Sequence, residues 1–198
     1  MKNNFEPGSV IAKEIYFYFK EGHKKKEAGV YNAEKIKEWM KCRNVEALGV
    51  LYYFLTEERY YMKIDPPLNF QDYFYFIKDY FSLCFKEDPD DLWADSKYGA
   101  GRDLVGWFKS FWEANNVPRK YLKDIKTWIG ELYKDGNKEM KECIVNATLE
   151  HLFENKEIRR FFSDWEKDPD LVEAYKLALE WSNEMPNIPT SPENDDSI

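Results

Sequence analysis

The sequence predicts an all-α protein, a single multi-helix domain of about eight antiparallel-packed helices. Two observations lead to this prediction. Apolar residues recur every three or four positions in one segment after another, which is the period of an amphipathic helix. The segments between them are short and contain Pro, Gly or capping residues, as in bundles of antiparallel helices. The chain has 198 residues, enough for one domain, and we expect that domain to span residues 1–185.

Three helices are expected before the first pair of prolines. Ser9 is a suitable N-cap for a helix over Val10–Lys20, although the letters IYFYF in this segment also have high strand propensity. Asn32 can cap a second helix that continues to Arg43. A third helix is predicted over Val45–Ile64, where leucine and tyrosine follow helical spacing until two prolines stop it.

The segment Phe70–Phe85 is the most unusual part of the chain. It holds eight aromatic residues in sixteen positions, and its apolar residues cover one helix face and spread onto others. A helix that is apolar nearly all round belongs in a core or under a partner. We therefore predict a helix here, with Phe74, Ile77 and Phe81 almost fully buried.

Two further helices follow in the middle of the chain. A loop at Gly99–Gly101 is expected to precede a helix rich in Trp and Phe, and Pro118 is expected to open the next one, which ends at Gly136. Backbone amides of the glycine loop could hold an anion. Neither of the glycine-rich nucleotide fingerprints is present, however, and a simple turn is favoured.

The last third of the chain predicts three helices and a tail. Lys138–Glu154 forms the first, Glu157–Trp165 a short second, and a third begins after Asp168 with Pro169 in its first turn. Residues 186–198 are rich in Pro, Asn, Ser and acidic residues, which predicts a disordered acidic tail. The apolar residues carried by this last helix are Leu171, Val172, Tyr175, Ala178, Leu179 and Trp181.

Charge and cysteine usage limit the partners and the compartment. The formal net charge is −8, and residues 137–198 alone hold 7 basic and 15 acidic residues. This balance argues against nucleic acid or anionic membrane as partners. Solubility is the simplest role of the acidic charge, and a basic protein is the partner that it would favour. The N-terminus lacks the apolar core of a signal peptide, no segment reaches 18 uninterrupted apolar residues, and the three cysteines are widely spaced. Together these features predict a cytoplasmic protein with reduced thiols.

A line of acidic residues is the clearest candidate for an interaction site. In the predicted helix 138–154, Glu142, Glu150 and Glu154 lie on one i, i+4 line, and like charges at this spacing destabilise a helix. The repulsion can be relieved inside the fold, which the forked geometry of arginine favours, or by a basic partner. The candidate cations within the fold are Arg102, Arg159 and Arg160. The predicted partner-binding residues are Glu142, Glu150, Glu154, Arg159 and Arg160.

No catalytic or metal-binding constellation is predicted. His151 and Glu154 have the i, i+3 spacing of half a metal site, but His23 is the only other histidine and lies in a lysine-rich loop. Because metal sites in proteins usually need three or four ligands, we expect no metal and no cofactor. A hydrogen-bonded histidine at the edge of the core is the favoured interpretation of His151.

The segment ECIVNATLEHLFENKEIRRFF, residues 142–162, resembles the closing region of uncharacterised bacterial all-helical families associated with polymorphic-toxin immunity. The resemblance is carried by the apolar positions 144, 145, 149 and 152, by Glu150, and by the run to Phe162. It implies a small, acidic, cofactor-free protein that acts by capping a toxin.

The function favoured by these observations is that of a soluble protein-binding factor, of the immunity or antitoxin type, that masks a basic partner. Two alternatives stay open. One is an enzyme whose site combines scattered carboxylates with His151. The other is a structural protein that forms homo-oligomers through its aromatic helix.

Overall fold

The computed structural model describes residues 5–23, 29–59, 62–114 and 117–184. Of these residues 74% are helical and 5% are in strands, which confirms the predicted all-α fold. The elements, in chain order, are α1 (Val10–His23), β1 (Gly29–Asn32), α2 (Ala33–Met40), α3 (Val45–Thr56), β2 (Met62–Asp65), α4 (Phe70–Glu87), α5 (Lys97–Glu113), α6 (Arg119–Asp135), α7 (Lys138–Ile144), a π-helix (Val145–Leu149), α8 (Glu150–Phe153), α9 (Lys156–Phe161), a 3-10 helix (Ser163–Lys167) and α10 (Val172–Glu184).

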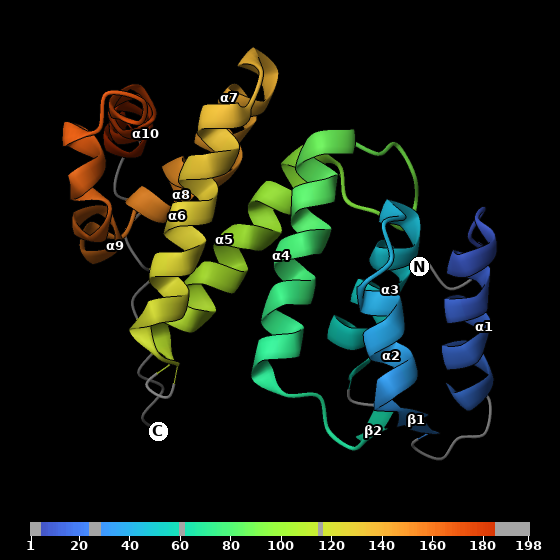
Figure 1. Ribbon diagram of the computed structural model, residues 1–198. Helices are drawn as coiled ribbons and strands as arrows, with labels where there is room; N and C mark the ends of the chain where they lie inside the picture. Colours follow the sequence, from blue (N-terminus) through green and yellow to red (C-terminus); the bar gives the residue numbers. More distant parts are fainter. Residues whose placement is uncertain (1–4, 24–28, 60–61, 115–116, 185–198) are drawn as a thin grey trace, which may run out of the picture.

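The helices are arranged in space roughly in chain order (Figure 1). Helices α1–α3 and the two strands lie at one end, α4 and α5 lie in the middle, and α6–α10 form the other end. Helix α1 packs on α3, α3 on α4, α4 on α5, α5 on the π-helix, and α10 on α8. A continuous cluster of buried apolar residues extends through all of these contacts, so the two ends share one core.

The aromatic helix packs into this core, and the three residues predicted to be buried are buried. In α4, Phe74, Ile77 and Phe81 are 1%, 2% and 0% exposed. Asn69 precedes the helix, and its side chain accepts a hydrogen bond from the amide of Asp72. The helix begins at Phe70 because this cap satisfies an amide that has no partner within the first turn.

Helix α1 begins at an acidic side chain supplied by another helix. Ser9 caps α1 as predicted, because its Oγ accepts from the amide of Ala12 at 3.3 Å. In addition, the Glu46 carboxylate at the start of α3 accepts hydrogen bonds from the amides of Gly8 and Ser9. Burial raises the pKa of Glu46, but these amides, the Ser9 hydroxyl and Lys13 bring it below the ordinary value of 4.5. The carboxylate therefore stabilises the fold in its ionised form.

Replacing Glu46 by alanine is expected to lower the free energy of unfolding at pH 7 by about 1 kcal/mol, the usual loss for an N-terminal cap. Because the pKa of Glu46 is lower in the folded state, its contribution is present above the unfolded value and is lost as the pH falls through the folded value. Urea unfolding of wild type and variant at pH 7 and pH 3 measures this. A stability difference at pH 3 as large as that at pH 7 would contradict the role of the ionised carboxylate.

A short parallel sheet corrects the predicted helix over Val45–Ile64. Helix α3 ends at Thr56, and Met62–Asp65 instead pairs with Gly29–Asn32, with Gly29 opposite Met62 and Asn32 opposite Asp65. The partner strand lies about thirty residues earlier in the chain, so local periodicity does not reveal the pairing. The segment IYFYF, for which a strand was the alternative, belongs to α1.

The glycines at 99 and 101 lie inside α5, which corrects the predicted loop. Ser96 caps the helix, and its Oγ accepts from the amide of Gly99 at 3.2 Å. A Cβ at Gly101 would lie 2.7 Å from the Cβ of Ala147, and the carbonyl of Gly101 accepts a hydrogen bond from Thr148 at 3.2 Å. Gly101 therefore permits close packing of α5 against the π-helix, and the helical turn here provides no glycine-rich anion loop.

Lys97 fixes three helix ends against one another. Its side chain is buried, and Nζ lies 3.0 Å from Asp88 at the end of α4 and 2.9 Å from Glu139 at the start of α7. The hydrogen bond with Glu139 and the pairing with Asp88 raise the pKa of Lys97, so the ammonium stays charged. This contact joins the end of α4, the start of α5 and the start of α7.

The predicted helix over Lys138–Glu154 exists but changes type in its middle. Asn137 caps it as predicted, and residues 145–149 form a π-helix between α7 and α8. The predicted helix after Asp168 begins later, at Val172. The segment Glu157–Trp165 divides into α9 and the 3-10 helix. The predicted disordered tail, residues 186–198, lies outside the described residues.

Candidate functional site

The π-helix divides the predicted acidic line. Glu142 lies in α7, before the π-helix, whereas Glu150 and Glu154 follow it. An i→i+5 turn adds one residue to the helical repeat, so side chains on either side of it no longer share the i, i+4 spacing. Glu142 consequently borders α10, while Glu154 lies close to α5.

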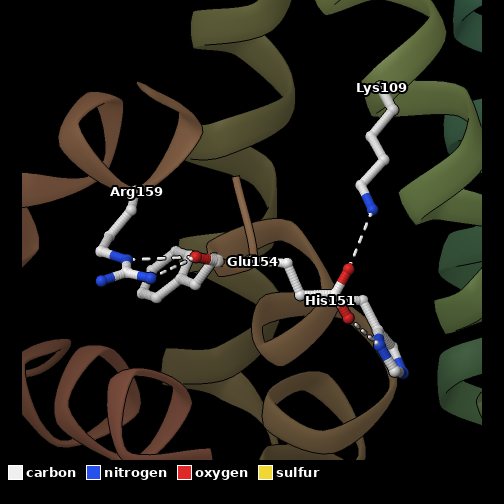
Figure 2. A network of polar contacts seen from close by, with 5 residues as sticks. Lys109, His151, Glu154 and Arg159 are labelled. Carbon is white, nitrogen blue, oxygen red and sulfur yellow. Dashed lines mark hydrogen bonds and ion pairs between the residues drawn. The ribbon is translucent and has the colours of Figure 1, made fainter. Parts of the chain in front are cut away.

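Glu154 has partners inside the fold (Figure 2). Its carboxylate lies 3.4 Å from Nζ of Lys109 and 3.2 Å from Nδ1 of His151. The sequence suggested arginines as the relieving cations, but a lysine of α5 takes this position. The neighbouring Glu150 is half-exposed and has no ion pair or hydrogen bond among the described residues. The charge of Glu154 is thus balanced by groups inside the fold, whereas Glu150 has no such partner within the described chain.

The two predicted arginines have separate contacts. Nε and Nη2 of Arg159 donate to the carbonyl of Phe153 at 3.1 and 2.8 Å, which satisfies a carbonyl at the end of α8 (Figure 2). Arg160 is exposed and pairs with Glu157 at 2.6 Å. The structure therefore does not bring Glu142, Glu150 and Glu154 together with both arginines in one cluster.

His151 and the cysteines provide little chemistry of their own. His151 is half-exposed at the edge of the core and bonded to Glu154, in the position expected for it. Burial raises the pKa of Cys84 and of Cys143 to about 12, so both thiols are protonated at neutral pH and poor nucleophiles. Within the part of the chain that the structure describes, no three His, Cys, Asp or Glu side chains gather in a way that could hold a metal ion.

A groove between α7 and α10 lies beside Glu142 and the π-helix. It has a volume of about 550 Å³ and borders the π-helix, and π-helical turns often occur at functional sites. Two of its lining residues, Tyr133 of α6 and Val145 of the π-helix, are buried apolar side chains. The remaining lining residues are Lys138, Lys141, Glu142, Asn146, Glu173, Leu177 and Trp181.

Two large apolar side chains on the α10 side of the groove remain exposed. Leu177 is 39% exposed and Trp181 is 49% exposed. They are four residues apart and form one stripe along α10 with Glu173, a further turn back. The sequence pattern groups Trp181 with the apolar residues of this helix but does not indicate Leu177, so the stripe is visible only in the structure. The helical period shows that these residues lie on one side of the helix, but it does not show whether another helix covers that side.

The charges around the groove are only partly compensated. Glu173 is exposed and has no ion pair or hydrogen bond within the described ranges. Glu142 pairs with Lys138 at 3.7 Å, but both side chains are largely exposed, at 55% and 91%. Such an exposed i, i+4 pair contributes only about 0.3–0.5 kcal/mol. Lys141 lies over the ring of Tyr133, 5.2 Å from its centroid, so Glu173 is the charged residue of the groove that has no partner within the described ranges, while Glu142 and Lys138 hold each other only weakly.

A smaller hollow of about 270 Å³ lies between α4 and α6. Some of its polar groups bond to one another, since Nε1 of Trp128 donates to Oγ of Ser82 at 3.0 Å and that hydroxyl donates to the carbonyl of Lys78 at 2.7 Å. Lysines and carboxylates both line it. The hollow is smaller than the groove between α7 and α10, and its lining lacks the exposed large apolar side chains found there.

Comparison with known proteins finds no match to this chain: no family model, no curated protein and no solved structure is significantly similar to it. Among the helices of the described segments, none combines the length and the apolar character needed to cross a membrane.

Proposed function

We propose that this protein is a cytoplasmic binding factor that captures a basic partner protein on the face between α7 and α10, in the manner of an immunity or antitoxin protein. The observation that carries the proposal is the exposed stripe of Leu177 and Trp181 beside Glu173, whose charge has no partner among the described residues. Interfaces are enriched in exposed aromatic side chains that anchor the partner, and a tryptophan beside a hollow is a typical anchor.

Charge supports a basic partner. The exposed carboxylates of Glu142 and Glu173 belong to the two helices that face each other across the groove. The last third of the chain, which contributes both, is the most acidic part of the sequence. A basic surface would be steered toward this face, and its binding would weaken as salt is added.

The alternatives gain less support. An enzyme built on His151 would need a nucleophile or further reactive groups beside the imidazole, whereas the contact that the described residues give it is to Glu154, which also pairs with Lys109. A homo-oligomer assembled through the aromatic helix would need the rings of α4 at the surface, whereas Phe74 and Phe81 are buried in the core. Tyr75 is the exposed aromatic residue in the middle of α4.

Site-specific photo-cross-linking in the cells that naturally produce the protein tests the proposal. We expect p-benzoyl-phenylalanine in place of Leu177 to cross-link one basic protein, identified by mass spectrometry, and a second substitution, Glu173→Lys, to abolish the product. The same photoreactive group in place of Tyr75 is the matched control, because Tyr75 is as exposed as Trp181 but lies on α4. If the groove position gives no cross-linked protein, or only those also obtained from the control position, the proposal fails.

A further inference from the structure

The two walls of the groove determine what kind of chain segment fits between them. Both walls are helices, α7 with the π-helix on one side and α10 on the other. Their backbone groups are bonded within the helices, so they present no sheet edge to an extended guest, whose own N–H and C=O groups would stay unpaired in the groove. A guest helix satisfies its own backbone and can place side chains between those of the walls.

The length and pattern of the exposed stripe match a short helix. Glu173, Leu177 and Trp181 succeed one another at i, i+4 along α10, about 12 Å from first to last by the helical rise. A guest of about two turns covers this distance. Its apolar residues, spaced by three or four positions, would then contact Leu177 and Trp181 together.

The charges add a requirement for the polar side of the guest. Glu173 at one end of the stripe has no partner in the described part of the chain, and Glu142 on the facing wall is held only by an exposed lysine at 3.7 Å. A lysine or arginine of the guest can pair with Glu173 directly and compete with Lys138 for Glu142. An acidic guest would meet Glu173, which has no partner to give up, and of the two lysines of the groove Lys141 already lies over Tyr133 and Lys138 is paired with Glu142.

We propose, on the basis of the function proposed above, that the groove binds an amphipathic helix of the partner. Two apolar side chains of that helix, one turn apart, contact Leu177 and Trp181, and a basic residue one turn away pairs with Glu173. The partner segment is thus defined by three side chains in helical register. The binding mode is that of a helix laid in a groove between two helices.

Fluorescence anisotropy with labelled synthetic peptides tests this inference. The probe is an 18-residue amphipathic helix of Leu, Ala and Lys, and two matched peptides replace every Lys by Glu or place a proline at its centre. We expect the lysine peptide to bind, and the glutamate and proline peptides to bind at least about tenfold more weakly, because they remove the charge match and the helix respectively. If the proline peptide binds as tightly as the lysine peptide, the inference that the guest is a helix is wrong.

Variants of the full-length protein locate the binding. Trp181→Ala should weaken binding of the lysine peptide about thirtyfold, the loss typical of a hot-spot tryptophan, and Tyr75→Ala, at an equally exposed site on α4, should not. Glu173→Lys should weaken binding and Glu21→Lys, with the same charge change on α1, should not. Equal losses in variant and control would place the peptide elsewhere and overturn the inference.

The outcomes separate this inference from the function on which it depends. Suppose that position 177 cross-links a basic protein but that the lysine and proline peptides bind equally well. The proposed function would then stand, and the inference that the guest is a helix would be rejected. Sedimentation of the protein alone completes the test. A dimer that Trp181→Ala dissociates would show that a second copy occupies the groove, and both proposals would fail.

Discussion

Replacing Phe81 by alanine is expected to lower the free energy of unfolding by about 3–5 kcal/mol. The ring is fully buried in α4 and its centroid lies 5.5 Å from those of Tyr52 and Tyr80 and 6.3 Å from that of Trp107. Its removal leaves a cavity between α3, α4 and α5, because these neighbours are themselves held by other rings. Chemical denaturation followed by circular dichroism measures the loss.

The control for this experiment lies on the same helix. Tyr75 is 49% exposed, and Tyr75→Ala should change the free energy of unfolding by no more than about 0.5 kcal/mol, as surface substitutions usually do. Similar effects of the two substitutions would contradict the burial of the α4 face that carries Phe81. The comparison separates the loss of core packing from any effect on helix propensity, because both substitutions introduce alanine into α4.

Introducing a side chain at Gly49 is expected to destabilise the protein by about 3 kcal/mol, the upper part of the range for overpacking. A Cβ at this position of α3 would lie 2.3 Å from the carbonyl oxygen of Trp93 and 2.7 Å from its carbonyl carbon. Both atoms belong to the backbone, so Gly49→Ala must shift the segment that joins α4 to α5. Thermal and chemical denaturation of the variant measure the effect.

Gly106 provides the opposite case in a neighbouring helix. A Cβ there meets no other atom within 4 Å, and the residue is exposed in the interior of α5. Gly106→Ala should therefore stabilise the protein by about 1 kcal/mol, the difference between the helix propensities of the two residues. A gain at both glycines would contradict the close approach of α3 to the backbone at Trp93.

Local signals in the sequence were sufficient for much of the fold. Ser9, Asn32 and Asn137 each start a helix at the predicted place, because a cap acts within one turn and depends on few residues. The buried face of α4 was predictable for a similar reason, since its rings repeat at the helical period. Helix ends were predicted less accurately where a distant segment decides them, as at Thr56, where the chain leaves α3 to pair as a strand with Gly29–Asn32.

The candidate site was less predictable than the fold. The sequence identified a line of glutamates, but the π-helix at Val145–Leu149 separates Glu142 from Glu154 and directs them to different neighbours. Close packing of Gly101 on Ala147 accompanies this π-helix. No local pattern signals it, because the contact joins segments far apart in the chain.

By itself, the sequence determined the all-helical class, the caps that start several helices and the burial of α4, because propensity, capping and apolar period act over a few residues. Only the tertiary structure decided which apolar stripes are covered. Trp181 and Phe81 both follow helical spacing, yet Phe81 is enclosed by α3 and α5 while Trp181 remains at the surface beside the groove. The physical reason is that burial depends on which other helix lies against a face, and that depends on contacts between distant parts of the chain.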